Sequence, residues 1–141
     1  MKENTLVSSI MTHTLITVTP NTTAKKVMDI FETHNIHHLP VLEGSKLVGI
    51  ISEVDILKIT HSIGLLHSKV DIEMNEKILN SVLAEEIMTS DTFTVESDDS
   101  LSTAAVLFSA NKFHALPVVE GGNLVGVLTT FDLIEHAYKE Q

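Results

Sequence analysis

The sequence repeats itself once, at a constant spacing of 77 residues. Ile-Met-Thr at 10–12 returns at 87–89, Leu-Pro-Val at 39–41 returns at 116–118, and Leu-Val-Gly at 47–49 returns at 124–126. When residues 10–57 are aligned with 87–134 without a gap, 16 of the 48 positions are identical. A duplication this regular predicts two similar supersecondary units, each too small to bury a hydrophobic core on its own.

Each copy predicts the element order strand, helix, strand, strand, helix. Residues 15–19 alternate between apolar and polar side chains, which is typical of a short strand. The next segment predicts a helix, because its apolar residues recur at i, i+3, i+4 and i+7 after N-cap candidates at 21–23. These apolar residues are Ala24, Val27, Met28 and Phe31 in the first copy, and Leu101, Ala104, Ala105 and Phe108 in the second.

A hairpin and a second helix complete each copy. Apolar runs at 39–42 and 47–51 flank a turn at 43–46, and the second copy has its turn at 120–123. The second helix is expected from about Ser52 and from about Thr129. We place the first motif at 1–57, a partly helical linker at 58–83 and the second motif at 84–141, and together they form one module. In the linker we expect the preceding helix to stop near Gly64 and a short helix to form at 75–81.

The charge and cysteine content of the chain disfavour several classes of function. The net charge is −10, from 19 acidic residues against nine lysines and no arginine, so we expect no nucleic-acid partner. The lack of cysteine removes disulfides, thiolate metal sites and cysteine nucleophiles. Neither a leader peptide nor an apolar run of about 20 residues is recognisable, so we expect a cytoplasmic protein without membrane contact.

One seven-residue motif recurs where the second helix of each copy should begin. It consists of a glycine, two aliphatic residues, a hydroxyl residue, two further residues and an aspartate. Its marked positions are Gly49, Ser52 and Asp55 in the first copy, and Gly126, Thr129 and Asp132 in the second.

Two interpretations of this motif are compatible, and the pattern alone leaves both open. In a capping box, the hydroxyl and the carboxylate bond the free N–H groups at the start of the helix. In a ligand site, those N–H groups and the hydroxyl bind a phosphate, and the carboxylate accepts hydrogen bonds from the two vicinal hydroxyls of a ribose. The glycine would allow another backbone or a ligand to approach the strand closely.

Together these features resemble a tandem pair of CBS (cystathionine-β-synthase) domains. The likeness rests on the two Ile-Met-Thr openings, the His-x-Leu-Pro-Val segments at 37–41 and 114–118, and the paired Gly-x-x-Ser/Thr-x-x-Asp motif, and it covers about residues 7–137. The resemblance implies an α+β fold of two β-α-β-β-α units, related by a pseudo-twofold axis and packed through their sheets. It also implies a stand-alone regulatory module with two clefts for adenosine-containing ligands such as AMP, ATP or S-adenosylmethionine.

The resemblance further implies which residues line each cleft. In one cleft Asp132 would hold the ribose and Thr129 the phosphate, with Leu15, Ile16, Thr17, Ile36 and His114 around the base. In the other, Asp55 and Ser52 would take those roles, with Thr92, Phe93, Thr94 and Phe113 around the base and His37 and His38 beside the phosphates. Both phenylalanines are equally good core residues, and for Phe113 we expect the core position.

Under this interpretation the chain requires no cofactor, and its ligand is a regulatory adenosyl compound. The position after His37 or His114 is often basic in nucleotide-binding members of the family, and here it holds His38 or Ala115. Without arginine, and with a net charge of −10, the chain lacks a strong clamp for a triphosphate. We therefore expect AMP, another adenosine derivative or S-adenosylmethionine in preference to ATP, and better tolerance of phosphate at the Asp55/His38 site than at the Asp132/Ala115 site.

Other functions have weaker support in the sequence. No nucleophile–base–acid set and no P-loop is identifiable, so we do not expect an enzyme. His34, His37 and His38 would be splayed by the predicted strand, so we expect no metal site.

The alternative to a ligand sensor is a ligand-free module for dimerisation and protein interaction. Under either hypothesis we expect a homodimer and an unidentified protein effector. Apolar helix faces such as Val27/Phe31 and Ala104/Phe108 are expected to be core, and they are also candidates for the interface between repeats or chains.

Overall fold

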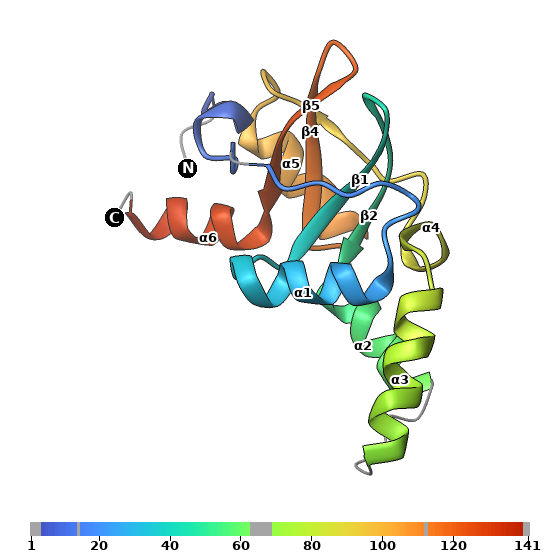
Figure 1. The fold of residues 1–141 in the computed structure, drawn as a ribbon. Helices are drawn as coiled ribbons and strands as arrows, with labels where there is room; N and C mark the ends of the chain where they lie inside the picture. Colours follow the sequence, from blue (N-terminus) through green and yellow to red (C-terminus); the bar gives the residue numbers. More distant parts are fainter. Residues whose placement is uncertain (1–3, 14, 63–68, 112, 140–141) are drawn as a thin grey trace. The chain divides into compact units, whose positions relative to one another are not determined.

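The chain forms two compact units, one of which joins both ends of the sequence. The structure, a computed structural model, describes residues 4–13, 15–62, 69–111 and 113–139 (Figure 1). The central unit comprises Ile16–Asp91, and the terminal unit combines Met1–Leu15 with Thr92–Gln141. Each unit therefore combines most of one repeat with the opening segment of the other, where the opening segments are residues 7–13 and 84–90.

Both units have a mixed α+β architecture, as expected. The central unit contains α1 (Ala24–His34), β1 (His38–Glu43), β2 (Lys46–Ser52), α2 (Glu53–Ser62), α3 (Lys69–Ser81) and α4 (Ala84–Ile87). The terminal unit contains the short 3-10 helix η1 (Val7–Ser9), β3 (Val95–Glu96), α5 (Leu101–Asn111), β4 (Ala115–Glu120), β5 (Asn123–Thr129) and α6 (Thr130–Lys139). The helix, hairpin and second helix predicted for each repeat are all present.

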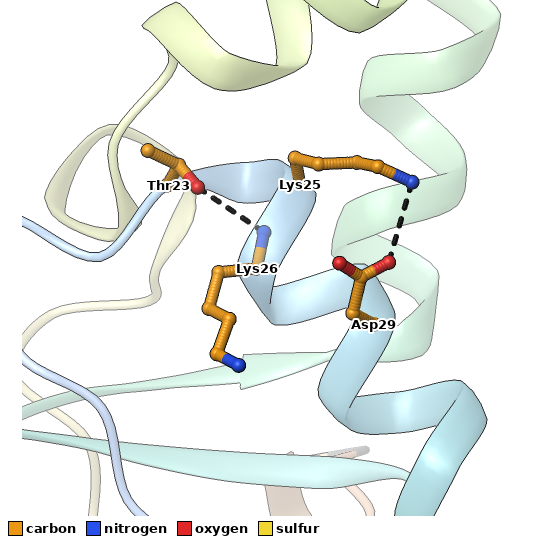
Figure 2. A network of polar contacts seen from close by, with 4 residues as sticks. All are labelled: Thr23, Lys25, Lys26 and Asp29. Atoms are coloured by element: carbon orange, nitrogen blue, oxygen red, sulfur yellow. Dashed lines mark hydrogen bonds and ion pairs between the residues drawn. The ribbon is translucent and has the colours of Figure 1, made fainter.

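The N-terminus of α1 shows how the sequence starts a helix here. Thr23 has an extended backbone, and its Oγ1 accepts a hydrogen bond from the backbone N–H of Lys26 at 3.1 Å (Figure 2). Lys25 Nζ lies 3.2 Å from Asp29 Oδ1, one turn further along the helix (Figure 2). The helix ends at Asn35, which takes the left-handed conformation (φ +50°) that favours a helix stop.

The apolar helix faces considered as interface candidates belong to the two cores. Val27 and Phe31 are buried in the central unit, in one cluster with Leu39, Val41 and Ile51 from the β1–β2 hairpin. In the terminal unit Ala104 and Phe108 are buried in a cluster that includes Leu116, Val118 and Leu128. The expectation that these faces are core is confirmed, because each packs against the hairpin of its own unit.

The two hairpins have matching registers. In the central unit the antiparallel pairing runs from His38 opposite Ser52 to Glu43 opposite Lys46, and the turn uses Gly44 at φ +63°. In the terminal unit it runs from Ala115 opposite Thr129 to Glu120 opposite Asn123. The start of the second helix in each repeat therefore lies directly beside the start of the first hairpin strand.

The prediction of a strand at residues 15–19 is wrong, because only one residue of this segment pairs with the sheet. Val18 forms an isolated parallel bridge with Val41. A turn follows directly, in which Thr22 N donates to Thr19 O at 3.1 Å, so the chain leaves the sheet after a single bridge. The equivalent segment of the second repeat forms β3, which has two residues and runs parallel to β4.

The opening segment of the second repeat packs onto the hairpin of the first. Thr89 and Ile50 exchange two backbone hydrogen bonds, of 2.9 and 3.1 Å. This approach requires Gly49, because a Cβ there would lie 2.5 Å from Met88 Sδ and 2.9 Å from Thr89 O. The motif glycine was expected to allow the close approach of another backbone or of a ligand, and here it allows the approach of another backbone.

The opening segment of the first repeat packs in the same way onto the hairpin of the second. Thr12 and Val127 exchange backbone hydrogen bonds of 2.9 and 3.1 Å. A Cβ at Gly126 would lie 2.5 Å from Met11 Sδ and 3.0 Å from Thr12 O. The two repeats have therefore exchanged their Ile-Met-Thr openings, and each hairpin is completed by the other repeat.

The segment between the repeats is more helical than expected. α2 ends at Ser62, while Gly64, where we expected the helix to stop, lies outside the described residues. α3 runs from Lys69 to Ser81 and packs against α1, so it starts well before the predicted residue 75. The sequence from 69 to 74 alternates polar and apolar residues, which concealed the helical period. Within the described ranges, no helix combines the length and hydropathy that crossing a bilayer demands.

Candidate functional site

The hydroxyl–carboxylate pair of the first repeat forms a capping box at the start of α2. Asp55 Oδ2 accepts a hydrogen bond from Ser52 N at 2.8 Å and another from Ser52 Oγ at 3.1 Å. In return, Asp55 N donates to Ser52 Oγ at 3.3 Å. Three bonds within four residues fix the carboxylate over the first turn of the helix.

The start of α6 repeats this arrangement in the terminal unit. Asp132 Oδ2 accepts a hydrogen bond from Thr129 N at 2.8 Å, and Asp132 N donates to Thr129 Oγ1 at 3.1 Å. The capping interpretation of the motif is therefore confirmed in both repeats. Asp55 and Asp132 accept these hydrogen bonds at Oδ2, and both side chains are half-buried, so neither carboxyl group is enclosed by the fold.

Backbone hydrogen bonds tie the histidine segments to these helix starts. Glu53 N donates to His37 O at 3.1 Å, and Thr130 N donates to His114 O at 3.0 Å. His38 lies opposite Ser52 in the strand register. The structure therefore brings His37, His38, Ser52 and Asp55 together in the central unit, and His114, Thr129 and Asp132 together in the terminal unit.

Glu53 is a charged residue of this region that the sequence analysis missed. Its Oε2 lies 3.1 Å from His37 Nδ1, and both side chains are partly exposed, by 47% and 65% respectively. Glu53 is the first residue of α2, where an acidic side chain is favoured by the helix dipole. The sequence could have indicated Glu53, because it lies between the motif residues Ser52 and Asp55.

The two aromatic candidates stack on each other in the terminal unit. The Phe93 and Phe113 ring centroids are 5.6 Å apart with an interplanar angle of 28°, and Phe113 meets Phe108 edge-on at 5.9 Å and 67°. Phe113 packs against the hydrophobic core, which confirms the position expected for it. Phe93 is 54% exposed, so one end of this aromatic ladder reaches the surface.

The corresponding positions of the first repeat are aliphatic. Ile16 and Ile36 replace Phe93 and Phe113, and both pack against the core of the central unit. The other base-lining candidates differ in exposure: Leu15 and Thr92 are half-buried, and Thr17 and Thr94 are exposed. The two repeats thus offer different surfaces to a flat ring.

The central unit also has a pocket that none of these residues lines. It has a volume of about 320 Å³ and is lined by Thr19, Pro20, Asn21, Leu42, Glu43, Gly44 and Glu85. Glu43 and Gly44 belong to the turn end of the hairpin, whereas Ser52 and His38 lie at its other end. None of its lining residues belongs to the predicted ligand sites, and we assign it no part in them.

Histidine and acidic side chains do not gather into a metal site in the part of the chain that the structure describes. No group of three or more His, Asp or Glu residues is placed there to hold an ion. His37, which belonged to the histidine cluster considered from the sequence, is engaged with Glu53 instead.

Comparison with known proteins identifies the same repeats. The profile of the CBS domain family matches residues 7–62 and 84–139. Protein MJ1225 of Methanocaldococcus jannaschii is 30% identical over 135 residues, which are 95% of this chain and 48% of MJ1225. The crystal structure of MJ1225 matches with a TM-score of 0.79 over 97% of this chain and 49% of that protein. The chain thus spans about half the length of this relative.

Two solved structures of comparable length contain ligands. CBSX2 from Arabidopsis thaliana, solved in complex with AMP, is 26% identical, has a TM-score of 0.77 and is covered over 98% of its length by 96% of this chain. The CBS domain pair of protein MJ0100, solved with 5′-methylthioadenosine and S-adenosyl-L-methionine, is 29% identical with a TM-score of 0.78. That match covers 97% of this chain and 98% of the MJ0100 pair.

Proposed function

This chain belongs to the CBS domain family, and we propose on that basis that it is a regulatory module that binds an adenosine-containing ligand. The observation that carries the proposal is the recurrence of one half-exposed hydroxyl–carboxylate helix start, Ser52 with Asp55 and Thr129 with Asp132. Support comes from relatives of similar length that hold AMP, 5′-methylthioadenosine and S-adenosylmethionine.

Capping and ligand binding are compatible in this proposal. A carboxylate has two oxygens and about four acceptor sites, so Oδ2 can keep its bond to the helix while Oδ1 accepts from the ribose hydroxyls. The first N–H group of each helix bonds a histidine carbonyl and the third bonds the motif hydroxyl. We therefore expect the second N–H group, of Val54 or Phe131, and the motif hydroxyl to face the 5′ substituent of the nucleoside. Phe93 offers a ring face for the base, and the remaining candidates complete the proposed sites: Leu15, Ile16, Thr17, Ile36, Thr92, Thr94, Phe113, His37, His38 and His114.

The ligand should be a nucleoside or a monophosphate in preference to a triphosphate. The chain has no arginine to form a bidentate clamp on a polyphosphate, and its net charge is −10. AMP, another adenosine derivative or S-adenosylmethionine therefore fits the charge of the chain better than ATP. The role of the ligand is regulatory in this proposal, because binding favours whichever arrangement of the chain binds it best, and a protein effector reads that arrangement.

We also propose that the chain forms a homodimer through the exposed face of its second helices. On α6, Phe131, Ile134 and Tyr138 recur at i, i+3 and i+7 and are 68%, 67% and 78% exposed. Large side chains bury about 150–250 Å² each, so these three offer roughly 400 Å², about half of the ~800 Å² per partner of a stable interface. Val54 and Leu57, at the equivalent positions of α2, are exposed as well.

A ligand panel on matched variants tests the proposed binding. Thermal melting would be followed with AMP, ADP, ATP, 5′-methylthioadenosine and S-adenosylmethionine on the wild type, Asp55→Ala, Asp132→Ala and the double variant. A ligand present at a hundredfold excess over its Kd stabilises by about 2.7 kcal/mol. We expect this stabilisation with at least one adenosyl compound and its complete loss in the double variant.

Thr23→Ala is the matched control, because it removes a helix cap of the same kind from α1. It should lower the melting temperature of the free protein and leave the ligand-induced shift intact. A shift that survives in the double variant would contradict the assignment of the two aspartates. No shift with any adenosyl compound, in a protein that still dimerises, would favour the ligand-free interaction module.

A further inference from the structure

The two proposed ligand sites differ in charge at a position that the sequence repeat makes equivalent. α2 starts with Ser52, Glu53, Val54 and Asp55, whereas α6 starts with Thr129, Thr130, Phe131 and Asp132. The first turn of α2 therefore has two carboxylates, and the first turn of α6 has one.

The backbone surroundings of these two positions are alike, although His38 lies beside the first helix start where the second has Ala115. Each first helical residue donates its N–H to a histidine carbonyl, Glu53 to His37 and Thr130 to His114, at 3.1 and 3.0 Å. The difference lies in the side chains. Glu53 Oε2 contacts His37 Nδ1 at 3.1 Å, so the acid and an imidazole that is proposed to flank a phosphate lie together beside the helix start.

A carboxylate at this place alters which ligand a helix start prefers. The start of a helix and its dipole attract an anion, but a carboxylate within the same turn of about 5.4 Å opposes a phosphate and favours a neutral or positive group. Thr130 adds a hydroxyl at the equivalent point of α6, and a hydroxyl can donate a hydrogen bond to a phosphate oxygen.

We infer that the two sites divide the adenosyl ligands by charge. The Asp55 site, with Glu53, selects a neutral or cationic 5′ group such as a thioether or a sulfonium, and the Asp132 site, with Thr130, takes a nucleoside monophosphate. Glu53 and Thr130 are the residues that determine this specificity. The inference rests on the proposed adenosyl-binding function, and it reverses the expectation that phosphate is tolerated better at the Asp55 site.

Calorimetric titration of single-site variants tests the division. Asp132→Ala leaves the Asp55 site, and Asp55→Ala leaves the Asp132 site. The probes are AMP, which has an anionic 5′ group, and 5′-methylthioadenosine, which has a neutral one. We expect Asp132→Ala to bind 5′-methylthioadenosine more tightly than AMP, and Asp55→Ala to show the opposite order.

Charge substitutions then assign the effect to the two residues. In the Asp132→Ala background, Glu53→Gln should tighten AMP binding by about three- to tenfold and leave 5′-methylthioadenosine within about twofold, as expected for removal of one charge near a partly exposed anion. In the Asp55→Ala background, Thr130→Glu should weaken AMP binding by a similar factor. Glu76→Gln, an equal charge change on the exposed side of α3, should alter neither probe.

Melting of the unliganded variants separates this effect from damage to the fold. An acidic residue in the first turn favours a helix, so Thr130→Glu should not lower the melting temperature even though it weakens AMP binding. If both probes bind but Glu53→Gln shifts them equally or not at all, the inference is overturned and the proposed function stands. If the wild type binds neither these probes nor any other adenosyl compound, the proposed function fails and the inference fails with it.

Discussion

A single methyl group at Gly49 would test how tightly the opening segment of the second repeat fits against β2. A Cβ there would lie 2.5 Å from Met88 Sδ and 2.9 Å from Thr89 O. The thioether can rotate away, but Thr89 O accepts a hydrogen bond from Ile50 N at 3.1 Å and belongs to the backbone. We therefore predict that Gly49→Ala displaces the segment and lowers the free energy of unfolding.

The size of the loss follows from three contributions. Overpacking of a closed site costs about 1–3 kcal/mol. Weakening the two bridge hydrogen bonds removes up to about 1 kcal/mol each. Opposing these, the exchange of glycine for alanine stabilises by about 0.4–1 kcal/mol through the unfolded chain, because Gly49 is not at a positive φ. The expected net destabilisation is about 2 kcal/mol.

Urea unfolding followed by circular dichroism measures this loss. With an m-value of about 2 kcal/mol/M, the midpoint should fall by about 1 M without a change in m. In a Met88→Ala background the cost of Gly49→Ala should be smaller, since the thioether contact is gone and the carbonyl contact remains.

Gly44→Ala is the control for the loss of a glycine. Gly44 has φ +63° in the hairpin turn, and no described atom beyond its chain neighbours lies within 4 Å of the added methyl group. Its cost should be about 1–2 kcal/mol from backbone strain, with no dependence on Met88. A Gly49→Ala variant as stable as the wild type, or more stable, would refute the close-approach argument.

Three further substitutions test the cap, the aromatic ladder and the proposed dimer face. Thr23→Ala removes the acceptor for Lys26 N and should cost about 1 kcal/mol in urea unfolding; an unchanged stability would show that the cap contributes nothing. Phe93→Trp places the first tryptophan in the chain at the exposed end of the ladder, so AMP stacking there should quench its emission, and constant emission at saturation would place the base elsewhere. Ile134→Glu puts a charge in the apolar face of α6 and should raise the dimer dissociation constant at least about tenfold, since an unpaired charge is costly to bury. Light scattering would measure the mass, and a dimer of unchanged strength would exclude this face.

Periodicity and turn chemistry predicted most of the local structure. Ala24, Val27 and Phe31 lie on one buried face of α1, because residues spaced i, i+3 and i+7 share one face of a helix. The same logic placed the hairpins and both motif aspartates at helix starts. The alternating pattern at residues 15–19 wrongly predicted a strand. Strand pairing depends on how far the chain follows the sheet, and here the turn at Thr19 ends the pairing after the bridge at Val18.

The exchange of opening segments could not be predicted from the repeat. Met11 and Met88 occupy the same place in identical Ile-Met-Thr motifs, and Gly49 and Gly126 are equally matched, so either pairing satisfies the pattern. The contact between Glu53 and His37 was also hidden, because Glu53 has no acidic counterpart at Thr130 and repeat matching draws attention to shared positions only.

The exchange of opening segments has a consequence for any attempt to study half of this chain. A cut between α2 and α3 would give an N-terminal piece that retains Met11 but has lost Met88, the thioether that covers Gly49. Such a piece would leave the surface of β2 at Gly49 uncovered. It would also retain Met11, which in the intact chain packs against Gly126 in the same way that Met88 packs against Gly49. Two identical halves could then trade their beginnings and complete one another, as the two halves of the intact polypeptide already do.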